Sequence, residues 1–80
     1  MSEQKHQASI IKKLEKEGYY VLKLVKTNKN GIPDLLALKK NEEPLFIEVK
    51  VKNGKVSELQ KFRIKELKDQ GFKAIVDYES

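Results

Sequence analysis

Residues 44–51, Pro-Leu-Phe-Ile-Glu-Val-Lys-Val, have the composition of a buried strand but carry two opposite charges, Glu48 and Lys50. An ionised group inside a sheet costs several kcal/mol unless a partner or a metal compensates it. Because successive strand residues point to opposite faces, Glu48 and Lys50 share one face with Phe46. An ion pair on a solvated sheet face is the alternative, but Phe46 on that face argues against full exposure. We therefore expect the pair to have a functional use.

A second acid, Asp34, lies in another apolar segment, residues 32–38. Positions 34 and 48 sum to 82, so a hairpin centred on Asn41 would set the two carboxylates directly opposite each other. A centre displaced by half a residue would make them diagonal neighbours instead, and both registers stay open. Taken alone, Asp34 could also cap the turn after Pro33, since Asp is a common turn residue.

The rest of the chain predicts two helices and two more strands around these segments. Ser2 and Ser57 can cap the helix starts, and Gly18 and Gly71 stand where a left-handed residue often ends a helix. The expected elements are a helix at 3–17, strands at 19–25, 32–38 and 45–51, a helix at 57–70 with Leu59, Phe62, Ile64 and Leu67 inward, and a strand at 72–78. The first three strands can pair as antiparallel hairpins, and the last follows a helical crossover that favours a parallel neighbour. The expected fold class is α/β, a mixed four-stranded sheet flanked by helices in the order α-β-β-β-α-β.

Length and charge indicate one domain, residues 1–80, with a thin core, because a chain of this size buries only about 60% of its unfolded surface. Self-association, as a homodimer, is therefore expected. The 17 basic and 12 acidic residues give a net charge of +5, and Arg63 is the only arginine. Lysine suits phosphates, whereas base reading recruits the planar arginine fork. This balance favours a sequence-indifferent anionic partner, although such an excess is also common on ordinary proteins.

Several classes of site and location are excluded by composition. With no cysteine and one histidine, His6, the chain cannot build a thiolate or imidazole-rich zinc site. His6 is expected to be a partly exposed helix residue. No apolar run approaches the roughly 20 residues of a membrane span, and the N-terminus is too polar for a signal peptide. We expect a cytoplasmic protein, of a bacterial cell or of a host cytosol if phage-encoded, with no membrane partner and no small-molecule cofactor.

The two acids and the lysine suit metal-assisted chemistry. Two neighbouring carboxylates repel each other, and Mg²⁺ takes oxygen ligands while borrowing only one or two protein carboxylates. Such an ion polarises a phosphoryl oxygen and lowers the pKa of a bound water. Lys50 could orient that water or stabilise the charge that develops on the phosphate oxygens. These are the parts that hydrolysis of a phosphodiester requires.

Three ordered motifs carry a family resemblance over most of the chain. They are Gly31-Ile-Pro-Asp34, Phe46-Ile-Glu-Val-Lys50 and Gly54-Lys-Val-Ser-Glu-Leu-Gln60. Together they resemble the VRR-Nuc branch of the PD-(D/E)XK nucleases, which have the restriction-endonuclease-like fold. The segment between the first helix and Gly31 is shorter here than in longer members, so substrate contacts made there need not carry over.

The resemblance implies a role for each motif residue. Asp34 and Glu48 would be ligands of Mg²⁺ or Mn²⁺, with the main-chain carbonyl of Val49 as a third ligand and Lys50 as the catalytic lysine. It also implies that Gln60 and an acid on the first helix, here Glu3, complete the site. Both also have simpler interpretations. Gln60 matches the capping box that begins at Ser57, and Glu3 is an acid that favours the helix dipole.

The expected partner is DNA, and the lysines near the turn and just beyond the charged strand are placed to meet its phosphates. These are Lys23, Lys26, Lys29, Lys52 and Lys55. Tyr19 and Tyr20 are expected to be core or interface residues. The leading hypothesis is a metal-dependent endonuclease that selects branched or distorted DNA by backbone and shape and acts as a homodimer. The alternatives are a non-catalytic nucleic-acid-binding module with a nuclease-like fold and a protein-interaction domain indifferent to nucleic acid.

Overall fold

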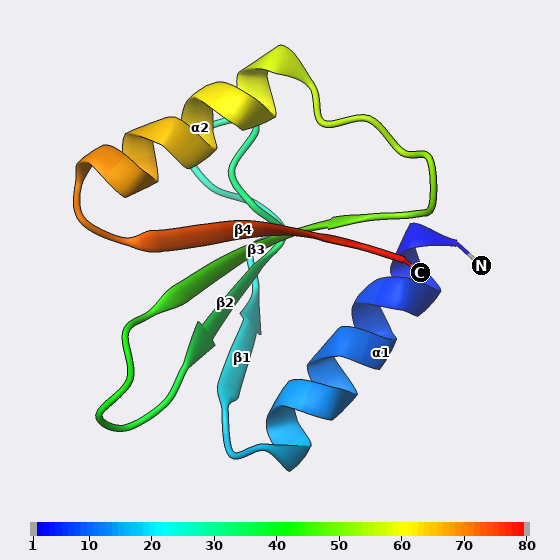
Figure 1. Cartoon of the computed structure of the whole chain (residues 1–80), viewed down its shortest axis with the longest axis vertical. Helices are drawn as coiled ribbons and strands as arrows, with labels where there is room; N and C mark the ends of the chain where they lie inside the picture. Colours follow the sequence, from blue (N-terminus) through cyan, green and yellow to red (C-terminus); the bar gives the residue numbers. More distant parts are fainter. Residues whose placement is uncertain (1, 80) are drawn as a thin grey trace.

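A computed structural model describes residues 2–79, and its helices and strands follow the expected order (Figure 1). The elements are α1 (Glu3–Lys16), β1 (Tyr20–Lys23), β2 (Leu35–Leu38), β3 (Leu45–Lys50), α2 (Glu58–Asp69) and β4 (Lys73–Tyr78). The predicted α/β class and the order α-β-β-β-α-β are confirmed. Within residues 2–79, neither helix is long and apolar enough to cross a membrane.

The four strands form one mixed sheet in the order β1-β2-β3-β4. The β1–β2 and β2–β3 pairs are antiparallel, while β3 and β4 are parallel and connected through α2. A parallel pair needs a crossover between its strands, and α2 provides it. The predicted hairpins and parallel last strand are confirmed, and β3 lies at the centre of the sheet with neighbours on both sides.

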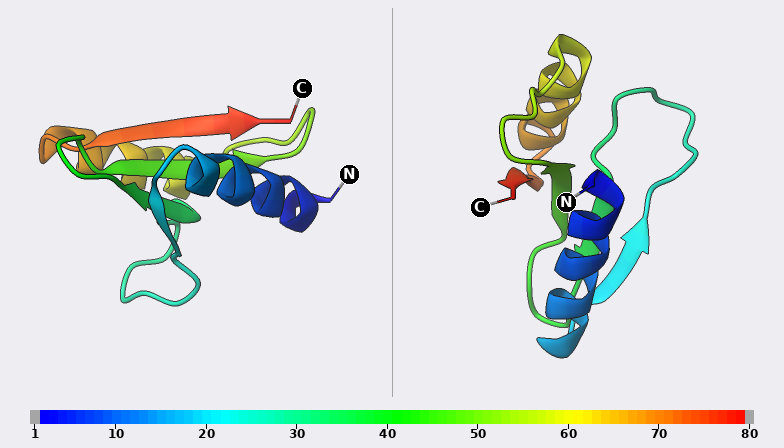
Figure 2. Two further views of the ribbon diagram at one scale, coloured as in Figure 1. Left: turned by 90° about the horizontal axis from the view of Figure 1, so that it is seen from below. Right: turned by 90° about the vertical axis from the view of Figure 1, so that its right-hand side faces the viewer.

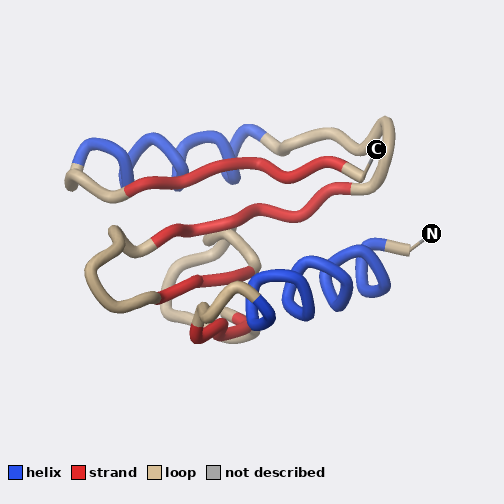
Figure 3. The backbone as a smooth tube through the Cα atoms, turned by 60° about the horizontal axis from the view of Figure 1, so that its bottom comes forward, coloured by secondary structure: helices blue, strands red, loops and turns tan. Residues whose placement is uncertain are grey.

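The two helices cover opposite faces of the sheet, as Figures 2 and 3 show. On the α1 face, strand residues of one parity pack against the apolar stripe of the helix. This core consists of Ile10, Leu35, Ala37, Ile47 and Val49, with Ile11, Leu14, Tyr19, Val21 and Leu45 packed around it. The alternation of β3 therefore turns Phe46, Glu48 and Lys50 to the α2 face.

The α2 face is packed much more lightly than the α1 face. No residue of α2 is buried, and its closest partner in the sheet is the edge strand β4. The expectation that Leu59 and Phe62 turn inward is wrong, because their side chains remain 44% and 53% exposed. The reason is geometric: a helix that lies over an edge strand has too little sheet beneath it to bury a whole apolar face.

The local signals for the helix ends are confirmed. The Ser2 hydroxyl accepts a hydrogen bond from the Lys5 N–H at 3.2 Å, which caps α1. Gly18 and Gly71 follow the two helices with φ of 94° and 93°. Left-handed values of this kind cost glycine little and end a helix cleanly.

All four strands are shorter than expected, β3 and β4 by one residue and β1 and β2 by three. The strand predicted at 19–25 is β1 only from Tyr20 to Lys23. It begins late because the N–H of Tyr19 is still bonded to the carbonyl of Leu14 in α1. The strand predicted at 32–38 begins only at Leu35. Pro33 has no N–H to donate to a ladder, so the chain before Leu35 lies outside the regular sheet.

The core on the α1 face should dominate global stability. Leu35→Ala removes a fully buried side chain from β2, and we expect it to cost about 2–5 kcal/mol. The control change Ile75→Ala, at a site that is 38% exposed on the edge strand β4, should cost less, about 1 kcal/mol. Urea unfolding followed by circular dichroism measures both. Equal losses for the two variants would contradict this placement of the core.

Candidate active site

The hairpin of β2 and β3 sets Asp34 opposite Glu48. Its paired residues, such as Leu35 and Ile47, have positions that sum to 82. Continuing this register by one residue beyond β2 brings Asp34 to Glu48, so the directly opposed arrangement holds. Asn41 lies at the centre of the turn with a φ of 67°, a left-handed conformation that asparagine tolerates better than most residues.

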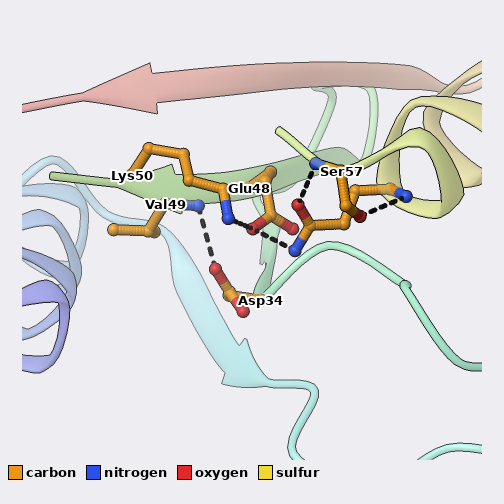
Figure 4. A network of polar contacts seen from close by, with 6 residues as sticks. Asp34, Glu48, Val49, Lys50 and Ser57 are labelled. Atoms are coloured by element: carbon orange, nitrogen blue, oxygen red, sulfur yellow. Dashed lines mark hydrogen bonds and ion pairs between the residues drawn. The ribbon is translucent and has the colours of Figure 1, made fainter. Parts of the chain in front are cut away.

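The Asp34 carboxylate is hydrogen-bonded to β3, the strand that carries Glu48. Its Oδ2 accepts a hydrogen bond from the Val49 N–H at 2.9 Å. The bond crosses the hairpin, so the carboxylate is not capping the turn after Pro33. The side chain of Asp34 thus accepts a backbone hydrogen bond from β3 at the residue just before β2 begins. Figure 4 shows Asp34 below β3, pointing at Val49 and close to Glu48.

Glu48 is the most completely buried charged side chain that the structure describes, at 1% exposure. Its Oε2 lies 3.5 Å from Lys50 Nζ and accepts a hydrogen bond from Gln60 Nε2 at 3.1 Å. Its Oε1 is buried and has no hydrogen-bond partner among residues 2–79. Burial, followed by the nearby charge of Asp34, raises the pKa of Glu48 to about 7, with Lys50 acting in the opposite direction. The site therefore holds one carboxylate that is poised between its charged and neutral forms.

Lys50 completes a buried ion pair with Glu48. It is 8% exposed, and it lies two residues after Glu48 on the same face of β3. A buried pair of this kind recovers its desolvation cost only when further hydrogen bonds satisfy the charges. The expectation that this pair is shielded from solvent is confirmed.

The amide of Gln60 reaches Glu48 from the first turn of α2. Its Oε1 accepts a hydrogen bond from the Ser57 N–H at 2.9 Å, and the Ser57 hydroxyl accepts one from the Gln60 N–H at 3.1 Å. This is a complete capping box. With the amide oxygen engaged by Ser57, the NH₂ group is left to face Glu48. Gln60 therefore caps the helix and contacts the buried acid at the same time.

A pocket of about 320 Å³ opens beside Asp34. Asp34 and Gln60 line it together with residues of the segment between β1 and β2, including Lys26 and Lys29. Two of the five lysines expected to meet phosphates therefore line the same pocket as Asp34.

The other three lysines do not line this pocket. Lys23 belongs to the β1 positions that face α1, on the side of the sheet away from Glu48. Lys55 lines a different pocket, between α2 and β4. Lys52 is exposed after β3, with its N–H 3.5 Å from an oxygen of Glu79.

Glu3 is not brought to the other acids. It is exposed in the first turn of α1, and α1 packs on the opposite face of the sheet from Glu48. Within residues 2–79, no three His, Cys, Asp or Glu side chains gather closely enough to hold a metal ion. Spacing along α1 aligned Glu3 with the inward residues, but the inward residues of α1 meet the face of the sheet opposite to Glu48. A ligand role for the carbonyl of Val49 stays a prediction.

One residue with a clear structural role near the site was not selected from the sequence. Arg63 donates a hydrogen bond from Nε to the carbonyl of Asn30 at 2.7 Å, next to the pocket. Its partner is 33 residues away in sequence, so no local pattern reveals the contact. The available signal was its position three residues after Gln60, on the same side of a helix, as the only arginine in a lysine-rich chain.

Two comparisons relate the chain to known proteins, and a third, with curated proteins, found no match. The VRR-NUC domain family matches residues 1–78. Among solved structures, Hjc, a Holliday junction resolvase from the archaeal hyperthermophile Archaeoglobus fulgidus, is similar with a TM-score of 0.74 and 18% sequence identity. The match covers 95% of this chain and 67% of that chain. At this identity the similarity shows the fold. The chain therefore belongs to the VRR-NUC family of nuclease domains and has the restriction-endonuclease-like fold.

Proposed function

We propose that this protein is a divalent-metal-dependent endonuclease that hydrolyses phosphodiester bonds in DNA. The observation that carries the proposal is the convergence of Asp34 on Glu48, a buried acid with an adjacent buried lysine and one unpartnered oxygen. A structural ion pair alone gives no reason to set a second acid beside Glu48, because that neighbour raises the pKa of Glu48 and weakens the pair. A metal-binding role accounts for both acids.

The donor set fits Mg²⁺ or Mn²⁺. Mg²⁺ is usually bound by one or two carboxylates and retains waters or substrate phosphate oxygens as its other ligands, which suits a site with two acids rather than three. Asp34, Glu48 and the carbonyl of Val49 would hold it. The buried Oε1 of Glu48 gains the partner that it otherwise lacks. When bound, the ion would polarise a phosphoryl oxygen and lower the pKa of a water.

The remaining site residues act on the water, the phosphate and the acid. In this proposal Lys50 orients the attacking water and stabilises negative charge on the phosphate oxygens. Gln60 holds the Glu48 carboxylate through its 3.1 Å hydrogen bond, and the capping box holds Gln60. Lys26 and Lys29 bind backbone phosphates at the adjacent pocket.

Branched or distorted DNA is the proposed substrate. The lysine-rich charge favours contacts to the backbone, which position a protein without reading its sequence. The structural neighbour is itself a Holliday junction resolvase. Recognition by shape needs a site that accepts a bent or unpaired strand, and the open pocket beside Asp34 suits that requirement.

A homodimer is also part of the proposal. Tyr20 and Leu22 lie on the β1 positions of the α2 face and are 68% and 39% exposed, while α2 itself contacts mainly β4. An apolar sheet surface without a helix over it favours association. Two copies would bring two sites to the two strands of a duplex.

Lys50→Met should abolish most of the cleavage while keeping the apolar stem of the side chain. We expect a rate loss of about 100-fold or more, as for other groups that stabilise developing charge. The assay uses junction, flap, single-stranded and linear duplex DNA with Mg²⁺ or Mn²⁺. Lys12→Met, on the exposed side of α1, is the matched control. Equal cleavage by the two variants would overturn the catalytic assignment.

Asp34→Asn should remove metal binding. Calorimetric titration with Mn²⁺ is expected to give a binding isotherm for the wild type and none for the variant, because the amide loses the charge that balances the ion. Asp69→Asn, which alters an exposed acid on α2, serves as the control and should bind like the wild type. If the wild type and both variants bind DNA in a salt-sensitive way but none of them gives a Mn²⁺ isotherm, the result would favour the non-catalytic binding module instead.

The metal-free protein should lose stability as the pH rises from 4.5 to about 7. Glu48 has its ordinary pKa of 4.5 in the unfolded chain and about 7 in the folded protein. Between these values the folded state holds a proton that the unfolded state releases, so folding is favoured at low pH. From about 1.4 kcal/mol per pKa unit we expect a loss of roughly 3 kcal/mol. Urea unfolding in EDTA measures it, and a constant difference between wild type and Glu48→Gln across this range would refute it.

A further inference from the structure

Residues 24–33, which we call the lysine loop, make up most of the chain between β1 and β2 and form one wall of the pocket beside Asp34. Lys26 and Lys29 belong to this wall, and Gln60 on α2 also lines the pocket. The loop extends from the sheet as a long excursion between the two strands (Figure 2). Where its lysines stand relative to Asp34 therefore depends on what holds the loop in place.

Arg63 fastens the lysine loop to α2. Its Nε donates a hydrogen bond to the carbonyl of Asn30, and its Nη1 donates one to Glu66 Oε1, both at 2.7 Å. The Arg63 side chain is only 17% exposed. A guanidinium presents its donors in a rigid fork, so one residue can grip a carbonyl and a carboxylate together, which the single ammonium of lysine does not reproduce. This explains an arginine at this position in a chain whose other cations are lysines.

Close packing at Gly31 supports the same attachment. A Cβ built on Gly31 would lie 2.7 Å from Leu59 Cγ and 3.4 Å from Arg63 Cγ. The φ of 82° at Gly31 also favours glycine. The loop backbone therefore lies directly against α2 at the residue that follows the Asn30 carbonyl.

One side of α2 thus positions both the acid and the loop. Gln60 contacts Glu48 at 3.1 Å, and Arg63, one turn later, holds Asn30. Residues three apart on a helix are neighbours, so the two contacts come from one side of the same short stretch of α2. The distance between the site acids and the lysines of the loop is set by this short stretch of helix.

We propose that Arg63 is a positioning residue for DNA binding, which holds the lysine loop so that Lys26 and Lys29 bind the backbone beside the scissile phosphate. The inference rests on the proposed function. Arg63 makes no contact with the reacting atoms in this proposal and acts only through the loop. Its loss weakens substrate binding and leaves the metal site intact.

The test compares Arg63→Met with Glu66→Gln. The first change keeps the apolar stem and removes the bond to Asn30, while the second removes the ion pair and keeps that bond. Hydrogen–deuterium exchange of residues 24–33 reports the anchoring. For Arg63→Met we expect faster exchange in the loop, a KM for junction DNA raised about tenfold with kcat little changed, and a salt slope of DNA binding reduced by about 2, near 1 per lysine. Glu66→Gln should behave like the wild type.

A second pair of variants disturbs the same contact from the loop side. Gly31→Ala introduces the Cβ that meets Leu59 and should reproduce the exchange, KM and salt-slope effects of Arg63→Met. Adding Leu59→Ala makes room for that Cβ and should restore part of the binding, with the left-handed φ still resisting alanine. Agreement between the two perturbations separates anchoring from a charge effect of Arg63 itself.

The outcomes distinguish this inference from the proposed function. Unchanged exchange of residues 24–33 in Arg63→Met overturns the anchoring. Faster exchange with unchanged KM and salt slope also overturns the proposal, because the loop then does not bind DNA. Loss of the Mn²⁺ isotherm in Arg63→Met assigns the residue to the fold instead. If wild-type protein binds Mn²⁺ but cuts no DNA, the proposed function fails, and exchange and salt slope still decide the role of Arg63.

Discussion

The burial of the Glu48 carboxylate beside Asp34 is the constraint on which the rest of the structure depends. Three separate local features meet at this one group: the alternation of β3 supplies Lys50, the hairpin register supplies Asp34, and the capping box of α2 supplies Gln60. A buried acid that lost the contacts of Lys50 and Gln60 would become neutral or would expose itself to water. The strands and α2 are therefore held in register by chemistry as well as by apolar packing.

The two faces of the sheet have different roles. The α1 face contains the apolar cluster around Leu35, Ile47 and Val49, whereas the α2 face carries the charges and the pocket. Because β3 contributes alternate residues to both, a one-residue slip would exchange Glu48 with Val49 and ruin core and site together. The core thereby enforces the position of the acids, although none of its side chains takes part in the proposed chemistry.

Most of the fold follows from local patterns in the sequence, and so does the part of the site that lies on the hairpin of β2 and β3. Alternation in residues 44–51 predicted the shared face of Glu48 and Lys50, and the sum of 82 with Asn41 at the turn predicted the opposed register as one of two choices. The exposure of Leu59 and Phe62 could not be predicted, because it depends on how little sheet lies beneath α2. The separation of Lys26 and Lys29 from Lys23 and Lys55 depends on loop conformation and on which pocket each borders. Arg63 depends on a contact with Asn30 that only the tertiary structure creates.

The light packing of α2 has a consequence for how this molecule opens. Segments with few buried side chains are the ones that unfold locally, at free energies well below that of the whole domain. None of the side chains of α2 is buried, yet this helix carries Gln60 and Arg63. The sheet and α1 can therefore stay folded while Gln60 and Arg63 lose their contacts with Glu48 and Asn30. The global free energy of unfolding is then only an upper limit on the stability of the complete site. A partner surface that covers Leu59 and Phe62 would bind only the folded form of α2. Its binding would therefore stabilise α2 and, with it, the complete site.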